Sequence, residues 1–150
     1  MTTSNHIYAG AVLAMAVQHP VIAMVAALGS HFLLDALPHY GRKGEEAVIG
    51  WFRYKATWVV EGLNVIGVPL LVYLLWGQPW WVFGAALLAI VPDAVWIFRY
   101  FRYERHGIQA PKSLITRVHN DIQWGERPWG AFVEVACFGI LIGILVKMVY

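Results

Sequence analysis

Long apolar runs separated by short polar connections dominate the chain. Apolar residues extend from Ile7 to Val17 and resume from Val21 to Leu37, with Gln18-His19-Pro20 between them. Pro20 lacks an N–H and biases the residue before it away from helical geometry. The pattern therefore predicts two helices, at about residues 4–18 and 20–37, packed as a hairpin through their many Gly, Ala and Ser residues. A single long helix over 4–37 is the alternative.

Further apolar runs cover about residues 55–76, 80–101 and 129–149. At about 1.5 Å per residue, each is long enough to cross a hydrocarbon layer of about 30 Å. Only Gly77-Gln78-Pro79 separates the first two runs, which predicts a tight antiparallel pair. Residues 112–124 repeat apolar positions at helical spacing but are too few to span, which indicates an amphipathic helix at the interface.

The expected fold is therefore all-α. It is a polytopic helical membrane protein with four to five membrane-crossing helices plus one interfacial amphipathic helix, in a single domain over residues 1–150. Composition agrees, because 59% of residues are hydrophobic and only 13% are charged, against about 45–50% and about 25% in soluble proteins. Membrane lipid is the expected surrounding and partner.

The distribution of charge predicts an orientation. Nearly all Lys and Arg lie around residues 41–55 and 99–117, and the turn at Gly77 has none. By the positive-inside rule, the connections 41–54 and 102–112 are expected to face the cytoplasm. The net charge of +2 and the absence of a basic stripe argue against nucleic-acid binding. The first residues carry no Lys or Arg, so no secretory signal is expected and the first apolar segment is retained.

Ionisable side chains inside apolar segments are costly and are functional candidates by default. Asp35, Glu61, Asp93 and Glu134 interrupt such segments. Measured from the cytoplasmic end of each segment, all four lie within about 10 Å of that interface. A shared depth predicts a site that faces the cytoplasm.

Histidines accompany these carboxylates. His31 and Asp35 are four residues apart and share a helical stripe, and His39 follows just beyond Pro38. Neutral imidazole and carboxylate are ligands that zinc and other divalent ions select. The expected metal ligands are His6, His31, Asp35, His39, Asp93 and His119. Glu61 is the expected general base.

Alternatives remain open for these residues. The whole set could be a structural polar network, or a pathway that relays protons or cations through the carboxylates. Glu61 could pair with Asn64, and Glu134 with Arg127. Asp93 follows Pro92, whose missing N–H bends a helix, so it could be a satisfied carboxylate at a bend. Cys137, the single cysteine, excludes an intrachain disulfide and suits a small packing residue.

One stretch resembles a known family. The run Gly29-Ser30-His31-Phe32-Leu33-Leu34-Asp35-Ala36-Leu37-Pro38-His39, with the early His6, is similar to bacterial inner-membrane proteins described as LexA-regulated, membrane-bound, metal-dependent hydrolases (YdjM-like). The resemblance implies a divalent-metal site and a hydrolytic activity. It carries over only to His6, His31, Asp35 and His39, and the family's frequent Pro-Asp-x-Asp-His block is not present in that form.

The expected function is a membrane-embedded, divalent-metal-dependent hydrolase, with zinc as the favoured ion. It would act on a phosphoester or lipid-like substrate at the cytoplasmic leaflet of a bacterial inner membrane. The rivals are a small subunit that translocates protons or cations and a non-catalytic membrane scaffold. The apolar outer half of every helix weighs against a transmembrane pathway. Homo-oligomerisation is left open.

Overall fold

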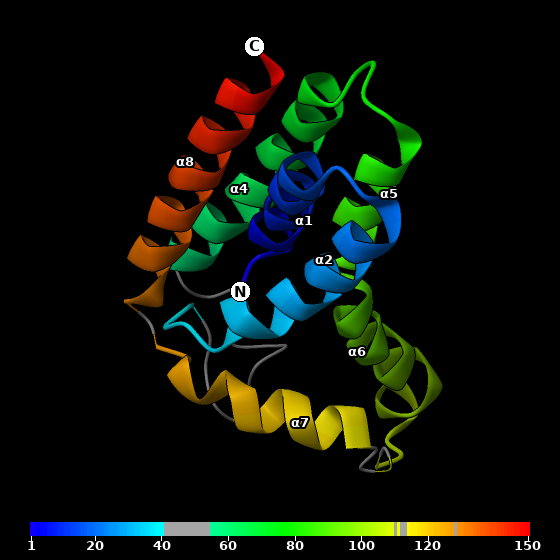
Figure 1. Ribbon diagram of the computed structural model, residues 1–150. Helices are drawn as coiled ribbons and strands as arrows, with labels where there is room; N and C mark the ends of the chain where they lie inside the picture. Colours follow the sequence, from blue (N-terminus) through cyan, green and yellow to red (C-terminus); the bar gives the residue numbers. More distant parts are fainter. Residues whose placement is uncertain (41–54, 110, 112–113, 128) are drawn as a thin grey trace.

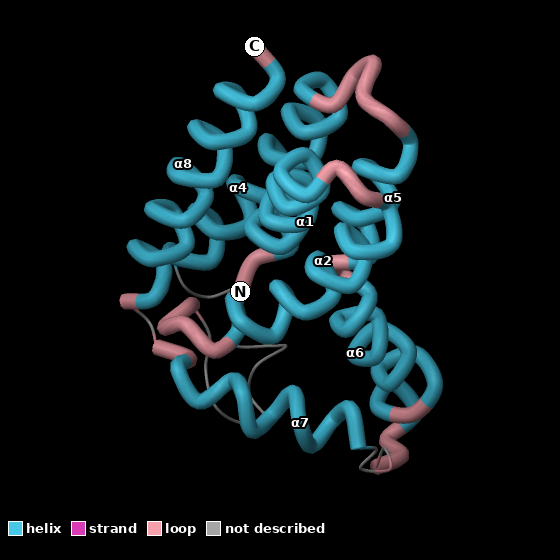
Figure 2. The backbone as a smooth tube through the Cα atoms, viewed as in Figure 1, coloured by secondary structure: helices cyan, strands magenta, loops and turns pink. Residues whose placement is uncertain are grey.

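The structure, a computed structural model, describes residues 1–40, 55–109, 111, 114–127 and 129–150. Over these residues it is built from helices, as expected, and β-pairing is confined to one isolated bridge between His39 and Glu126 (Figures 1 and 2). The elements are α1 (Thr3–Val17), α2 (Pro20–Asp35), α4 (Lys55–Leu74), α5 (Trp80–Leu88), α6 (Val91–Arg102), η1 (Glu104–His106), α7 (Leu114–Ile122), η2 (Gln123–Gly125) and α8 (Gly130–Val149).

The first two helices form the predicted hairpin. α1 ends at Gln18, which adopts a left-handed φ of 52° and donates its N–H to the carbonyl of Ala14. α2 begins at Pro20, with the side chain of His19 accepting the N–H of Ile22. The break that Pro20 predicts is therefore present, and the alternative of one long helix is wrong.

α1 is the central helix of the bundle, packed against α2, α4, α5 and α8 (Figure 1). Its crossing with α5 depends on Gly10. A Cβ at that position would lie 2.8 Å from the carbonyl oxygen of Ala85 and 3.0 Å from the Cα of Ala86. The two backbones are therefore in direct contact, and the small residues of both helices allow it. Away from the polar beginning of α1, the core consists of apolar side chains such as Ala14 and Leu75.

The expected tight pair of helices around Gly77 is wrong. The turn is as short as predicted, with Gly77 at a φ of 84°. α4, however, packs mainly against α8 and α1, whereas α5 packs mainly against α1 and α2. α1 therefore lies between the two helices that the turn connects.

The prediction of four to five membrane-crossing helices is also wrong. Over the described residues, only α8, with 20 residues, is long and apolar enough to cross a membrane. α2 and the apolar part of α4 over Trp58–Leu74 have 17 residues or fewer. At 1.5 Å per residue that is about 25 Å, short of a hydrocarbon layer of about 30 Å. For α1, α2, α5 and α6, apolar composition had indicated spans where helix length does not supply them.

The run 80–101 is broken rather than continuous. α5 ends at Leu88 and α6 begins at Val91, with a bend of 51° between them. Counting this bent pair as one span would raise the number of candidate spans to two. The cause is Pro92, which has no N–H to give to the preceding turn. Asp93 instead donates its N–H to the carbonyl of Ile90.

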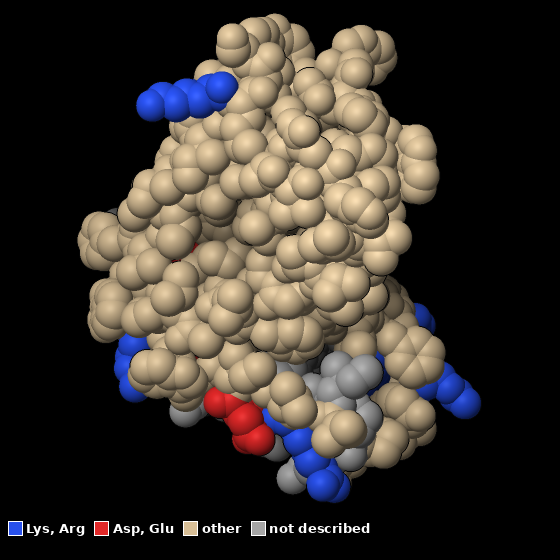
Figure 3. Space-filling model, viewed as in Figure 1, with Lys and Arg blue, Asp and Glu red and all other residues tan. Residues whose placement is uncertain are grey.

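α6, η1 and α7, named here the outer arm, extend beyond the bundle (Figure 1). In Figure 3, Lys, Arg, Asp and Glu gather at this end, apart from one basic side chain at the opposite end, and uncharged atoms cover the face between. α7 is the amphipathic helix expected within 112–124. The connection 41–54 lies outside the described residues, and the predicted orientation in a membrane stays a prediction.

Candidate metal centre

His6, His31 and Asp35 meet at the hairpin of α1 and α2. The Nε2 atom of His6 lies 3.1 Å from Oδ1 of Asp35, and Nε2 of His31 lies 3.3 Å from Oδ2 of the same carboxylate. The two imidazole rings are stacked, with centroids 4.1 Å apart. All three side chains are almost fully buried. The spacing of four residues between His31 and Asp35 along α2 is what turns both toward His6.

The bend between α5 and α6 adds two further groups. Because Asp93 donates its N–H to Ile90, the carbonyl of Ala89 is left without its regular helical donor. Nδ1 of His31 donates to that carbonyl over 2.8 Å. The same bend places Oδ1 of Asp93, in the first turn of α6, 3.8 Å from Nε2 of His31.

His6, His31 and Asp93 form a group that could hold a metal ion, since one ligand atom from each lies within 4.8 Å of the others. In a tetrahedral zinc site with bonds of about 2.0–2.1 Å, ligand atoms are about 3.3 Å apart. The separations of 3.1, 3.3 and 3.8 Å around Asp35 and His31 are close to that value. His31 also has the support typical of a metal ligand, because its other ring nitrogen is held by a carbonyl.

Electrostatics distinguish the two histidines. Burial lowers the pKa of His6 below its ordinary value, more than the hydrogen bond to Asp35 raises it. Burial also opposes protonation of His31, but the hydrogen bond to Asp35 and the charges of Asp35 and Asp93 outweigh it and raise the pKa of His31. His6 is therefore a neutral imidazole, ready to bind a metal, whereas a proton on His31 competes with one.

A cation already contacts the carboxylate of Asp35. The terminal ammonium of Met1 donates to Oδ1 of Asp35 over 2.5 Å, and both groups are buried. Nδ1 of His6, also buried, has no hydrogen-bond partner among the described residues. Buried polar atoms of this kind are usually satisfied by water or a ligand. The Met1 ammonium thus already neutralises Asp35, and the buried Nδ1 of His6 is left for a water or a ligand to satisfy.

A second set of polar contacts surrounds the first turn of α1. Oε2 of Glu134, on α8, accepts the N–H of Thr2 over 2.9 Å and Nδ2 of Asn5 over 2.7 Å. On α4, Oδ1 of Asn64 accepts the N–H of Ser4 over 2.9 Å. The residues that make these contacts, named here the polar layer, are Thr2, Ser4, Asn5, Asn64 and Glu134. Because Thr2, Ser4 and Asn5 precede His6 directly, their contacts with α4 and α8 fix the position of α1 relative to those helices.

The carboxylates predicted to share a depth are all found near this beginning of α1. Asp35 and Asp93 border His31, Glu134 belongs to the polar layer, and Oε2 of Glu61 accepts Nδ2 of Asn64 over 3.2 Å. The pairing of Glu61 with Asn64 is therefore observed. Pairing of Glu134 with Arg127 is not, because Arg127 donates to main-chain carbonyls, including that of Glu126 over 2.7 Å.

His39 lies apart from the group of His6, His31 and Asp93. Its Nδ1 donates to the carbonyl of Leu37 over 2.8 Å, and its backbone is held by the N–H of Arg127 over 2.9 Å. A Cβ on Gly130 would lie 2.1 Å from the carbonyl carbon of His39, so α8 begins in direct contact with this loop. His119 lies on α7, and its side chain is outside the described residues.

Several contributors were not identified from the sequence. The carbonyl of Ala89 carries no signature in a side chain, although Pro92 marks the bend that frees it. Thr2, Ser4 and Asn5 were available as a signal, because the run Thr-Thr-Ser-Asn-His is an unusually polar beginning for an apolar helix. The same polar run caps α1, with the side chain of Thr2 accepting the N–H of Asn5.

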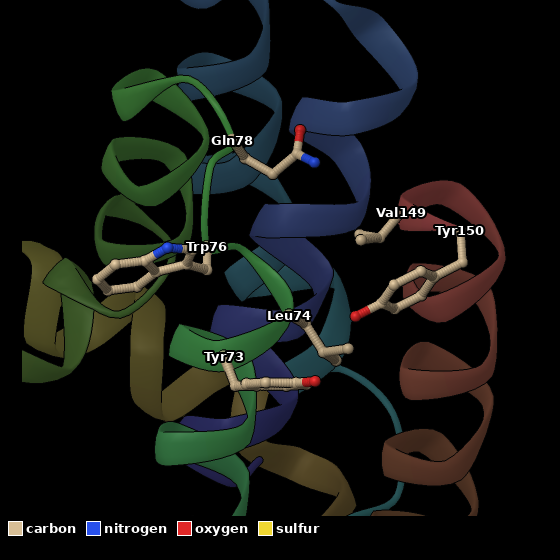
Figure 4. Close-up of a pocket in the computed structure, with 6 residues that line it drawn as sticks. All are labelled: Tyr73, Leu74, Trp76, Gln78, Val149 and Tyr150. Carbon is tan, nitrogen blue, oxygen red and sulfur yellow. The ribbon is translucent and has the colours of Figure 1, made fainter.

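A depression of about 580 Å³ lies far from this group, at the end where α8 finishes (Figures 1 and 4). It is lined by Tyr73, Leu74, Trp76, Gln78, Val149 and Tyr150. None of these is a carboxylate or an imidazole, so the depression adds nothing to a metal centre.

Comparison of the chain with family models, with curated proteins and with solved structures gives no match.

Proposed function

We propose that the chain is a membrane-bound, divalent-metal-dependent hydrolase that acts on a phosphoester or lipid-like substrate. The observation that carries the proposal is that ligand atoms of His6, His31 and Asp93, from α1, α2 and α6, lie within 4.8 Å of one another. Asp35 contacts both histidines. Nitrogen and carboxylate oxygen favour zinc or a similar divalent ion. Once bound, such an ion would supply an activated water and a Lewis acid for hydrolysis.

The protein's own residues would divide the work. His6 and His31 would hold the ion, with His31 oriented by the carbonyl of Ala89. The buried carboxylate of Asp35, which contacts both histidines, would add negative charge beside the ion. Asp93 has 32% of its side chain exposed, unlike the buried His6 and His31, so the site opens on that side. A substrate would enter past Asp93. Glu61 stays a predicted general base, with Asn64 as its described partner.

Membrane residence is supported by the surface. α8 is long and apolar enough to span. Large apolar side chains are also exposed on other helices, including Ile22 and Val25 on α2 and Val65 and Ile66 on α4, each more than half exposed. Large exposed apolar surface is unusual on a water-soluble monomer. A site beside a lipid-facing surface suits a lipid-like substrate, and we place it at the cytoplasmic leaflet of a bacterial inner membrane.

Metal content and hydrolysis test the proposal on the detergent-purified full chain. Elemental analysis should find about one or two divalent ions per chain, and a panel of phosphoesters and phospholipids should show release of phosphate or head group. Asp35→Asn and Asp93→Asn should each lose the metal and the turnover, because the amide lacks the anionic oxygen. Asp121→Asn, on the exposed surface of α7, is the matched control and should retain both.

Both substitutions are needed because Asp35 and Asp93 differ in burial. Asp35 is buried and contacts Met1, His6 and His31, so its substitution can disturb folding. Asp93 is partly exposed, and Asp93→Asn should leave the unfolding temperature nearly unchanged. Retention of full metal content in Asp93→Asn and Asp35→Asn would contradict the metal centre. Metal binding without turnover of any substrate would instead favour the scaffold.

A further inference from the structure

α7 presents its apolar stripe outward. Leu114 and Val118, four residues apart on one stripe, are 76% and 42% exposed. Thr116, on the opposite side of the helix, is 2% exposed. A helix at a water-facing surface has the reverse arrangement, with its apolar stripe against the core. The exposed stripe of α7 therefore calls for an apolar environment outside the bundle.

The remainder of the outer arm continues this surface. On α6, Ile97 and Phe98 are each 62% exposed, and Phe101 is 56% exposed. Ile108, which follows η1, is also more than half exposed. The outer arm thus carries large apolar and aromatic side chains outward along its length, although its helices are too short to span a membrane.

Basic side chains are interleaved with these apolar ones. The guanidinium carbons of Arg102 and Arg105 lie 5.8 and 5.7 Å from the ring centroids of Tyr103 and Phe101. Arg102, Arg105 and Arg117 are exposed and form no ion pair with any described residue. Arg99, by contrast, is paired with Glu104 over 3.3 Å. The outer arm therefore presents unpaired positive charge, and two of its guanidinium groups lie beside aromatic rings.

We propose that the outer arm docks on the surface of an anionic phospholipid leaflet. Leu114, Val118 and Phe101 would enter the boundary between head groups and acyl chains, as in an interfacial amphipathic helix. Arg102, Arg105 and Arg117 would contact lipid phosphates, which a neutral apolar partner could not satisfy. An apolar stripe together with unpaired basic residues fits a bilayer better than a nucleic acid, which needs no apolar insertion. The inference does not depend on metal binding at His6 and His31.

A lipid-contact measurement tests the inference. Leu114→Cys, in a Cys137→Ser background, provides one site for a fluorophore on α7. The labelled full chain is reconstituted into phosphatidylcholine vesicles in which either phosphatidylglycerol or phosphatidylcholine carries brominated acyl chains, at equal mole fraction. Bromine quenches a fluorophore that it touches. Brominated phosphatidylglycerol should be enriched at the label by about fivefold or more at low salt, since each basic residue near an anionic surface contributes about that factor.

Charge variants separate head-group recognition from simple apolar contact. The triple variant Arg102→Gln, Arg105→Gln, Arg117→Gln should reduce the enrichment to about one, and high salt should weaken it in the parent. Lys147→Gln, near the end of α8, removes the same kind of charge from the other end of the molecule and should change nothing. Absence of quenching by either lipid would show that something other than a bilayer covers α7. Equal quenching by both lipids would refute recognition of anionic lipid.

Discussion

The polar layer and the outer arm place polar and apolar groups in opposite positions. In the polar layer, Asn5 and Glu134 are buried and hydrogen-bonded to each other, inside a chain with few polar residues. In the outer arm, Leu114 and Phe98 face outward, while Thr116 is buried. Each arrangement is unfavourable for an isolated water-soluble domain, because buried polar groups need partners and exposed apolar stripes need cover.

The two regions depend on different things for their stability. The polar layer satisfies its groups internally, through contacts between α1, α4 and α8, so its stability depends on exact partners. The outer arm depends on what surrounds the molecule. Substitutions should therefore be costly for folding near the beginning of α1 and nearly neutral in the outer arm, and the following experiments test that contrast.

The largest effect is expected at Gly130, where α8 begins beside the loop of His39. An alanine Cβ would lie 2.1 Å from the carbonyl carbon of His39 and 2.6 Å from the backbone nitrogen of Tyr40, so the backbone must move. Gly130→Ala should lower the free energy of unfolding by about 3 kcal/mol or more. Gly143→Ala, in the same helix with open space around its Cβ, should be neutral or stabilising. Equal unfolding temperatures for the two variants would contradict this packing.

A smaller loss is expected when the polar layer loses its carboxylate. Glu134→Ala removes the acceptor of Thr2 and Asn5 and leaves both donors buried, which should cost about 2–3 kcal/mol in the free energy of unfolding. Glu134→Gln keeps one acceptor oxygen and should cost less. Glu104→Ala, at an exposed pair with Arg99, is the control and should change stability by under about 1 kcal/mol. Chemical denaturation in detergent measures all three.

Metal affinity should depend on pH through His31. Its pKa is raised above the ordinary value of 6.5, so a proton competes with the metal up to a higher pH than usual. While His31 is protonated, each unit of increase in pH should strengthen binding by about tenfold, and binding should release a proton. Above the raised pKa the dependence should flatten. Chelator competition at a series of pH values measures it, and affinity independent of pH would remove His31 from the ligands.

The smallest effect is expected in the outer arm. Leu114→Gln should change the free energy of unfolding in detergent by under about 0.5 kcal/mol, because that side chain is 76% exposed and packs on little. Leu145→Gln is the matched substitution at a fully buried position of α8 and should cost several times more. If the two variants were equally destabilised, another part of the chain would cover α7, and the contrast between the two regions would be wrong.

Local signals in the sequence predicted much of the fold. Pro20 located the break of the first hairpin, and Gly77 located the short turn between α4 and α5. The number of spans was not predictable in the same way, because apolar composition does not report where a helix ends or bends. The partner of α4 was also missed, since the placement of α1 between α4 and α5 depends on a contact at Gly10, distant in the chain from Ala85.

The candidate site was partly visible for a similar reason. The spacing of His31 and Asp35 fixes their common stripe, so their meeting follows from helical geometry alone. The approach of His6 and Asp93 depends on tertiary packing and on the bend at Pro92. The sequence placed His39 with the other histidines, but its loop is held by Gly125 and Arg127, which give it backbone partners of its own. The depth of an ionisable residue along its helix predicts that it lies at the same level as the others. It does not predict which of these side chains contact one another.

α6 connects the outer arm with the group of His6, His31 and Asp93. Its first turn carries Asp93 to His31, and its last turn carries Arg102. Its 12 residues give a length of about 18 Å, and the helix would pivot at the break before Val91. A tilt of about 10° would move the far end by about 3 Å but Asp93 by under about 1 Å. If the outer arm docks on a bilayer as proposed, a large displacement at the end of α6 that carries Arg102 would shift the carboxylate of Asp93 only slightly.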